Sequence, residues 1–179
     1  MDCPLIIQLF HQILYCHETF ALCSCIIART GCYNDCMQYW QRCEAVIDKL
    51  PNHIKVTYKG RLNATEAREV AKDYDAFFLP TMSENYGYVI EEALLCGCPV
   101  VISRGTTPWD DVDGLGGFAG DLDAQDKFVA ELEKISNMDD TEYKRYVKNL
   151  HKYIYDKLSY EKLVNDYKTL IDRVATTKK

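Results

Sequence analysis

Two spacings of apolar positions alternate along this chain. A spacing of three to four residues predicts an amphipathic helix, and a short apolar run or strict alternation predicts a strand. The expected helices cover residues 5–14, 37–50, 63–74, 88–94, 124–136, 141–158 and 159–174. We expect Asn63 with Glu66 to cap the third of these and Asp123 to cap the fifth. The tyrosines of the last two are expected to be packing residues. The expected strands cover residues 24–28, 54–58, 75–79 and 99–103. Because helices and strands alternate as far as residue 103, we expect an α/β fold, a parallel sheet with helices on both faces.

The most informative stretch is residues 77–93, which reads as a buried strand, a short turn and a helix. The apolar run ends at Pro80, which cannot donate to a continuing ladder. We expect Thr81 and Ser83 to cap the first free amides of the helix, and Gly87 to let a ligand approach the backbone. Free amides at the positive end of a helix dipole favour an anion such as phosphate.

Two carboxylates bracket this predicted anion site, Glu84 in the turn and Glu92 inside the helix. At a rise of about 1.5 Å per residue, Glu92 lies roughly 8 Å along the axis from the helix start. This separation suits a diphosphate with a sugar at each end, one carboxylate serving each sugar. The alternative is that Glu92 is a solvated helix residue and Glu84 a charge favoured by the dipole.

Three segments around this turn resemble the donor-site signature of family 4 glycosyltransferases. They are residues 83–87 (Ser-Glu-Asn-Tyr-Gly), 92–94 (Glu-Ala-Leu) and 97–103 (Gly-Cys-Pro-Val-Val-Ile-Ser). The family consists of retaining enzymes with two Rossmann-like domains, and the resemblance extends over about residues 39–170. It implies that this chain is a single domain of the B-type glycosyltransferase fold, namely the C-terminal domain that binds the donor nucleotide.

The resemblance also implies roles for individual positions. In the family, the residue matching Glu84 contacts the donor sugar, and we expect a catalytic role for it in orienting that sugar. The residue matching Glu92 holds the ribose hydroxyls, and the loop carrying Gly60 and Arg61 lies against the base. The backbone amides that lie near the diphosphate belong to Asn85, Tyr86 and Gly87.

Three candidate donor-binding residues come directly after predicted strands: Gly60, Glu84 and Thr107. Ligands of parallel sheets bind beyond the carboxyl ends of the strands, so we expect these residues to share one edge. The family implies a UDP-, GDP- or ADP-sugar as donor, a glycan or lipid-linked acceptor, retention at the anomeric carbon, no cofactor and no obligatory metal. Glycan biosynthesis is the expected process.

The first 30 residues differ from the family and from the rest of the chain. The family's domain opens with a strand and a loop whose Arg and Lys grip the diphosphate, whereas the first basic residue here is Arg29. We therefore expect three segments: an atypical opening at 1–30, truncated or frame-disrupted, a donor-binding domain at 31–174, and a tail at 175–179. The preceding acceptor domain is expected to be missing, so that the chain is incomplete alone.

Two other functions stay open at this point. The first is a non-catalytic nucleotide-sugar-binding module or a degenerate fragment of such an enzyme, which the missing basic loop favours. The second is a nucleotide-sugar epimerase, for which the sequence offers no His or carboxylate pair.

The composition of the 179 residues, 47% hydrophobic and 27% charged, is that of a globular domain. A net charge of −6 argues against nucleic acid or an anionic membrane as the main partner. No apolar run approaches the length of a membrane span. We expect a cytoplasmic protein, with peripheral membrane association as the alternative, and hence nine free cysteines.

Three local patterns favour other interpretations more weakly. A zinc site could use His17, Cys23, Cys25, Cys32 and Cys36, but a paired C-x2-C motif is lacking. Residues 1–25 contain an apolar run, but no Lys or Arg precedes it as in a signal peptide. Asp111-Val112-Asp113 could be a D-x-D metal site, but its glycine-rich surroundings favour turns. We therefore expect no metal site.

Overall fold

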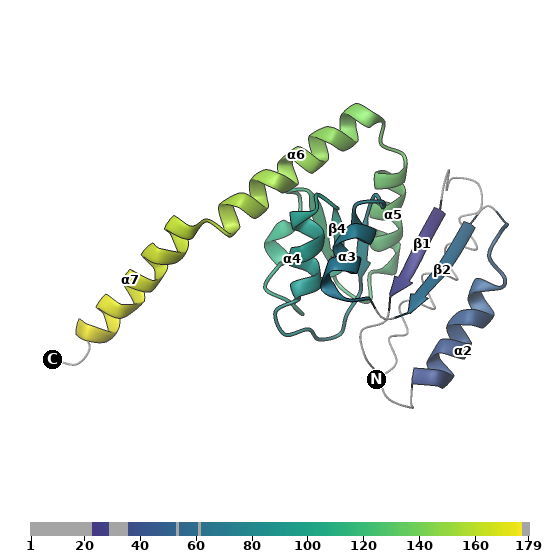
Figure 1. Cartoon of the computed structure of the whole chain (residues 1–179), viewed down its shortest axis with the longest axis horizontal. Helices are drawn as coiled ribbons and strands as arrows, with labels where there is room; N and C mark the ends of the chain where they lie inside the picture. Colours follow the sequence, from purple (N-terminus) through teal and green to yellow (C-terminus); the bar gives the residue numbers. More distant parts are fainter. Residues whose placement is uncertain (1–22, 29–35, 53, 61, 177–179) are drawn as a thin grey trace.

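The computed structural model describes residues 23–28, 36–52, 54–60 and 62–176 (Figure 1). The elements are, in chain order, β1 (Cys23–Ala28), α2 (Cys36–Ile47), β2 (Ile54–Gly60), α3 (Ala64–Ala71), β3 (Phe77–Leu79), α4 (Tyr88–Leu95), β4 (Val100–Ser103), the 3-10 helix η1 (Asp110–Val112), β5 (Gly117–Gly120), α5 (Gln125–Ser136), α6 (Asp140–Lys157) and α7 (Tyr160–Thr176).

The described strands form two sheets and every pairing is parallel. Strands β3, β4 and β5 make one sheet, in which Val100 of β4 lies between Phe77 and Gly117. Strands β1 and β2 pair with each other in a separate sheet, with Cys23 opposite Ile54. The predicted α/β class with parallel strands is confirmed, but the four predicted strands do not form one continuous sheet.

One face of the three-stranded sheet packs against α3, α4 and α6. Alternate strand positions point to this face, because successive strand side chains alternate between the two faces of a sheet. Phe77 and Leu79 of β3 and Val100 and Ile102 of β4 lie here, with Ala119 of β5. The helices contribute Ala71, Ile90, Ala93, Leu94, Leu150, Tyr153 and Ile154.

The other face packs against α5. The intervening strand positions, Phe78, Val101 and Phe118, contact Phe128 and Val129 of this helix. Phe128 meets Phe78 and Phe118 edge to face, with ring centroids 5.9 and 5.5 Å apart, the arrangement that aromatic quadrupoles favour. The prediction of helices on both faces is therefore confirmed for this sheet.

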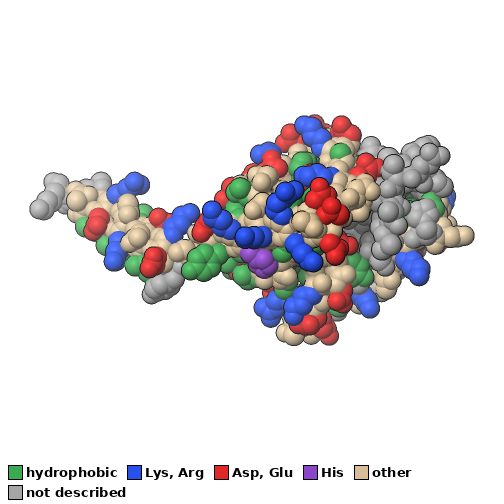
Figure 2. Space-filling model, turned by 90° about the horizontal axis from the view of Figure 1, so that it is seen from above, with side chains coloured by type: hydrophobic (Ala, Val, Ile, Leu, Met, Phe, Trp, Pro, Cys, Tyr) green, Lys and Arg blue, Asp and Glu red, His purple; other side chains and the backbone are tan. Residues whose placement is uncertain are grey.

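The C-terminal helix α7 projects from the body of the molecule, beyond the end of α6 (Figures 1 and 2). Its exposed apolar side chains, 53–64% accessible, are Leu163, Tyr167, Leu170, Ile171 and Val174. These positions lie on one side of the helix, at spacings of three, four and one residues. No helix in the described ranges is long and apolar enough to cross a membrane.

The predicted bounds of most elements agree with the structure, and α6 differs from its prediction by one residue at each end. Asn63 and Glu66 form the predicted capping box of α3. One strand was missed: β5 has the sequence Gly-Phe-Ala-Gly, which offers neither an apolar run nor β-branched residues.

Three local predictions were wrong. Thr81 and Ser83 bond to each other, hydroxyl to backbone, and neither caps α4. Asp123 does not cap α5, whose N-cap is Ala124 without a side-chain hydrogen bond. Gly60, expected in a loop, is the last residue of β2. The predicted helix at 5–14 lies outside the described residues.

Candidate functional site

The turn between β3 and α4, residues 80–87, lies at the carboxyl end of β3. Its first residues are held by the neighbouring strand, because the Ser103 hydroxyl, fully buried at the end of β4, donates to the Thr81 carbonyl. The Glu84 amide donates to the Thr106 carbonyl at 3.2 Å. The turn is therefore joined to the loop that follows β4, and both lie at the same edge of the sheet.

Gly87 is the N-cap of α4 and has a left-handed backbone, with φ 77° and ψ 51°. A β-carbon at this position would lie 2.9 Å from Ile90 Cδ1, a side chain that is itself fully buried. No side chain caps the helix here. Among the described residues, the amides of Gly87, Tyr88 and Val89 have no hydrogen-bond acceptor, so this helix start offers several donors to an anion.

The two predicted carboxylates flank this helix start along the chain. Glu84 is exposed in the turn, and Glu92 is half-buried in α4, one helical turn after Tyr88. Neither carboxylate has a hydrogen-bond or ion-pair partner among the described residues. The oxygens of both carboxylates are therefore available to a ligand.

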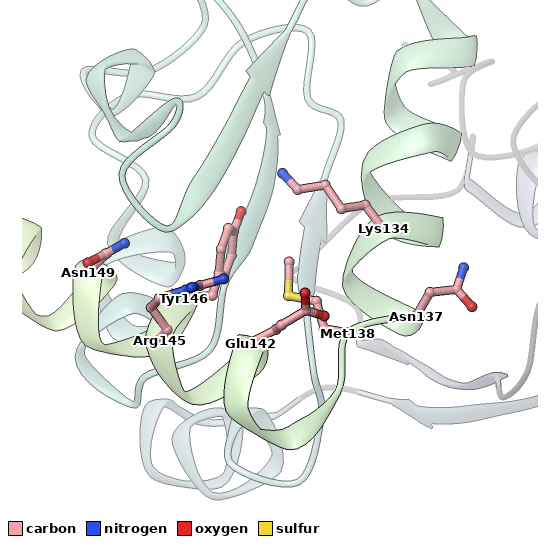
Figure 3. A pocket seen from close by; sticks show the side chains of 7 residues that line it. All are labelled: Lys134, Asn137, Met138, Glu142, Arg145, Tyr146 and Asn149. Carbon is pink, nitrogen blue, oxygen red and sulfur yellow. The ribbon is translucent and has the colours of Figure 1, made fainter.

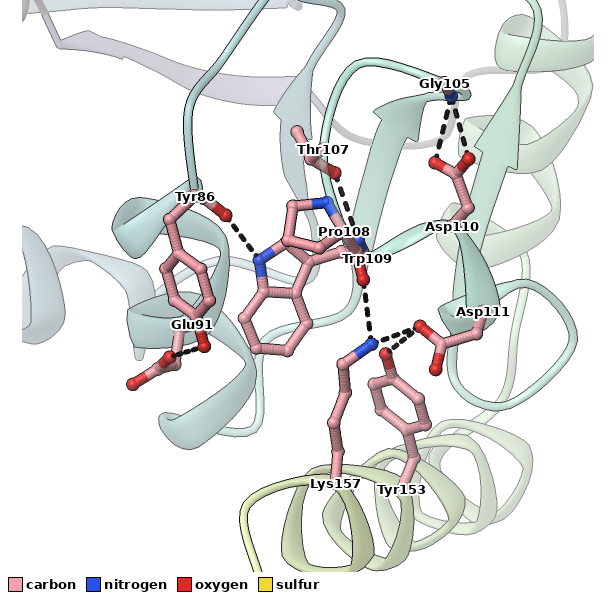
Figure 4. A network of polar contacts seen from close by, with 10 residues as sticks. All are labelled: Tyr86, Glu91, Gly105, Thr107, Pro108, Trp109, Asp110, Asp111, Tyr153 and Lys157. Carbon is pink, nitrogen blue, oxygen red and sulfur yellow. Dashed lines mark hydrogen bonds and ion pairs between the residues drawn. The ribbon is translucent and has the colours of Figure 1, made fainter. Parts of the chain in front are cut away.

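The predicted site residue Thr107 lies in the loop after β4, close to the turn. Its hydroxyl accepts a hydrogen bond from the Trp109 amide at 3.2 Å. The Trp109 side chain is fully buried, and its indole N–H donates to the Tyr86 carbonyl at 2.8 Å (Figure 4). Glu84, Tyr86 and Thr107 therefore lie at one edge of this sheet, where the sequence had predicted Glu84 and Thr107 together with Gly60.

The proposed base-binding residues are not brought to this edge in the same way. Gly60 ends β2, which belongs to the two-stranded sheet. Arg61 lies outside the described residues. Asn85 is exposed in the turn, next to Glu84.

Tyr86 packs its ring against Trp109 and bonds its hydroxyl to α4. The hydroxyl donates to Glu91 Oε2 at 2.7 Å, and the ring meets Trp109 edge to face at 5.5 Å. Burial, followed by the Glu91 carboxylate, raises the pKa of Tyr86 to about 12. The phenol is therefore a neutral hydrogen-bond donor at physiological pH.

The two acidic residues of the D-x-D pattern are each paired with a protein cation. Asp111 accepts from Lys157 and, at 2.7 Å, from the Tyr153 hydroxyl, whereas Asp113 accepts from Arg104 at 2.8 Å. Burial alone would raise the pKa of Asp111, but the hydrogen bonds from Lys157 and Tyr153 outweigh it and lower the pKa. Within the described ranges, no three metal-ligating side chains come together.

Sequence reasoning did not identify the polar network around Trp109. Lys157 and Tyr153, both on α6, reach the loop after β4 from the far side of Trp109 (Figure 4). The tyrosines of α6 were interpreted as packing residues, but the hydroxyl of Tyr153 also donates a hydrogen bond to Asp111. Contacts that join positions more than forty residues apart leave no periodic signal in the sequence.

Two shallow hollows lie on the surface of α6, away from the turn. One, of about 310 Å³, is lined by residues of α5, α6 and the segment between them (Figure 3). Its Lys134 pairs with Glu131 at 2.9 Å and lies 5.5 Å from the centre of the Tyr146 ring. The other, of about 420 Å³, lies along α6 between Tyr143 and His151. Neither contains a predicted donor-site residue.

Comparisons with known proteins agree with this architecture. No curated protein matches the sequence. Two similar solved structures are the Candida albicans trehalose-6-phosphate phosphatase N-terminal domain and TarM. The first has a TM-score of 0.64 and 14% identity over 85% of this chain and 35% of that chain. The second has a TM-score of 0.69 and 19% identity over 93% of this chain and 32% of that chain.

These TM-scores show that the fold is shared, and the chain spans about a third of the length of each of the two proteins. The family is shown by sequence: residues 38–153 match the family described as "Glycosyl transferases group 1". This range contains the whole turn, both carboxylates and the loop after β4. The chain therefore belongs to the group 1 glycosyl transferases, and it carries one domain of their B-type fold.

Proposed function

We propose that this domain binds a nucleoside diphosphate sugar at the turn between β3 and α4. The observation that carries the proposal is the pair of unpartnered carboxylates, Glu84 and Glu92, on either side of a helix start with free amides. The amides of Gly87, Tyr88 and Val89 suit the diphosphate, and the carboxylates suit the hydroxyls of the two sugars.

Glycosyl transfer builds negative charge on the leaving diphosphate. Amides already fixed at a helix start would stabilise that charge without reorganising, which is the main way in which such a site lowers a barrier. Glu84 would orient the donor sugar, and Glu92 would hold the ribose. Thr107, at the same edge, would border the donor.

Transfer also requires an acceptor held in line with the donor inside a closed cleft. The described residues supply one wall of such a cleft, and Arg104, the cation directly after β4, is already bonded to Asp113 and to the Ala119 carbonyl. We therefore expect weak donor binding and no turnover for this chain alone.

Titration calorimetry with UDP-, GDP- and ADP-glucose tests the proposal. One of the three should bind, and Glu92→Gln, which keeps the shape but removes the charge, should raise its Kd about tenfold or more, because a hydrogen bond to a charged group contributes about 1.5–3 kcal/mol. Glu161→Gln, an exposed carboxylate in the first turn of α7, is the matched control and should leave Kd unchanged.

Equal affinities of wild type and Glu92→Gln would contradict the assignment of the site. Transfer by the purified chain to a glycan acceptor, without a partner protein, would contradict the expectation that this chain forms only one wall.

A further inference from the structure

The backbone of the donor turn is oriented by a buried tryptophan. Trp109 donates its indole N–H to the carbonyl of Tyr86, at 2.8 Å, from the core side of the turn. A trans peptide is planar, so its N–H points opposite to its C=O. The peptide N–H of Gly87 therefore points away from Trp109, and it has no acceptor among the described residues.

Trp109 is held in turn by Lys157, the last residue of α6. The Lys157 ammonium donates to the Pro108 carbonyl at 2.9 Å and to Asp111 Oδ1, and it lies 4.8 Å from the centre of the Trp109 ring (Figure 4). An ammonium has three donors and no acceptor. Two of its N–H groups donate to Pro108 and Asp111, which precede and follow Trp109 in the chain. The ammonium also lies over the face of the Trp109 ring, a cation–π contact.

Asp111 and Tyr153 fix the position of this ammonium. The Tyr153 hydroxyl donates to the same Asp111 oxygen that Lys157 contacts, and its ring centre lies 5.4 Å from Nζ. The Lys157 side chain is only 23% exposed, so its charge is poorly hydrated and depends on these partners. The chain of contacts is Asp111 to Lys157, Lys157 to Trp109, and Trp109 to the Tyr86–Gly87 peptide.

We propose that Lys157 is a positioning residue for donor binding: acting through Trp109, it holds the Gly87 amide in the orientation that receives the diphosphate. This inference rests on the proposed donor site. It adds that the end of α6, about seventy residues away in the chain from the turn, determines the affinity of the turn for a diphosphate.

The experiment compares three variants with wild type. Lys157→Met keeps the aliphatic stem and removes the ammonium, Lys157→Arg restores a cationic donor, and Trp109→Phe keeps a ring and removes the N–H. The matched control is Lys134→Met on α5, because Lys134, like Lys157, pairs with a carboxylate and lies over a tyrosine ring (Figure 3). The hollow that Lys134 lines contains no residue of the turn. Calorimetry measures Kd for UDP, GDP and ADP.

We expect Lys157→Met and Trp109→Phe to raise Kd about tenfold, the size of one hydrogen bond to an oriented group, and Lys157→Arg and Lys134→Met to stay within about threefold. A second readout needs no ligand. The indole N–H signal of Trp109, assigned in a Trp40→Phe background, should exchange with solvent faster in Lys157→Met than in Lys134→Met.

The failures can be told apart. If wild type binds one of the three nucleotides and both Lys157→Met and Trp109→Phe bind it equally well, the positioning role is wrong and the donor site remains. If wild type binds none of the three nucleotides, both the proposed donor site and the positioning role of Lys157 are wrong. If Lys157→Met does not fold, as judged by circular dichroism, Asp111→Asn replaces it and should raise Kd in the same direction.

Discussion

Replacing Gly87 by alanine perturbs the start of α4 in two separable ways. A left-handed backbone costs a residue with a β-carbon about 1–2 kcal/mol. The added methyl group would also lie 2.9 Å from Ile90 Cδ1, and Ile90 is fully buried and cannot turn aside freely. Forcing an extra carbon into a packed core costs about 1–3 kcal/mol. The expected loss is the sum, about 2–5 kcal/mol.

Gly105→Ala isolates the backbone part of this cost. Gly105 has a φ of 75°, against 77° for Gly87, but nothing lies within 4 Å of the place its β-carbon would occupy. Its loss should be only about 1–2 kcal/mol. The difference between the two variants is then the packing cost at Ile90.

Urea unfolding followed by circular dichroism gives the free energy of unfolding of both variants. A domain of ordinary stability, about 5–15 kcal/mol, is stable enough for losses of this size to be measured. Equal losses for the two variants would refute the steric argument, and a larger loss for Gly105→Ala would refute the backbone argument as well. Gly87→Ala should also weaken nucleotide binding, because relieving the contact with Ile90 would shift the backbone that carries the free amides. Unchanged binding by a destabilised Gly87→Ala would contradict this expectation.

Three further predictions concern thiols, pH and packing. Burial, with a smaller contribution from Asp75, raises the pKa of Cys98 to about 12. A disulfide reagent at pH 8 should therefore modify the half-exposed Cys96 of the native protein well before the buried Cys98. Unfolding in urea should abolish this difference in the rate of modification. The pKa of Asp111 is lowered in the folded state, so its stabilising effect is present above the unfolded pKa of about 3.9 and is lost as the pH falls through the lower folded value. At pH 7 the free energy of unfolding of wild type should therefore exceed that of Asp111→Asn, by less than about 1 kcal/mol because the Asp111 side chain is largely exposed. A difference that grows toward pH 2 would contradict this expectation. Leu150→Ala, at a fully buried position, should cost about 2–5 kcal/mol, whereas Leu163→Ala, 53% exposed on α7, should stay within about 0.5 kcal/mol in the same urea assay.

The periodic parts of this fold were predictable from sequence, and the reasons are local. Helix α6 combines a capping box at Asp139 with a regular apolar stripe, and its predicted bounds are almost those observed. Strand β5 was missed because its residues Gly117–Gly120 become a strand only through pairing with β4. Thr81 and Ser83 were misassigned as helix caps because their hydroxyl chemistry serves a turn equally well.

The candidate site divides in a similar way. Glu84 and Glu92 could be named from a motif, because their spacing and the turn between them lie in one continuous segment. The residues that hold this turn could not be identified from a motif, because Trp109 contacts Tyr86 on one side and Lys157 on the other. Sequence distance hides such contacts, and only the packing of α6 across the sheet brings them together.

Helix α7 has a consequence for the protein's local opening equilibria. Every side chain from Glu161 to Thr176 except Val164 is exposed. A helix of seventeen residues with so little packing is only marginally stable in water. Its amides should therefore exchange with a free energy of opening near zero, while those of α4 and β4 approach the global value. Any surface that covered the stripe from Leu163 to Val174 would slow this exchange greatly. Amide exchange along α7 is thus a sensitive reporter of whether the domain is alone or assembled.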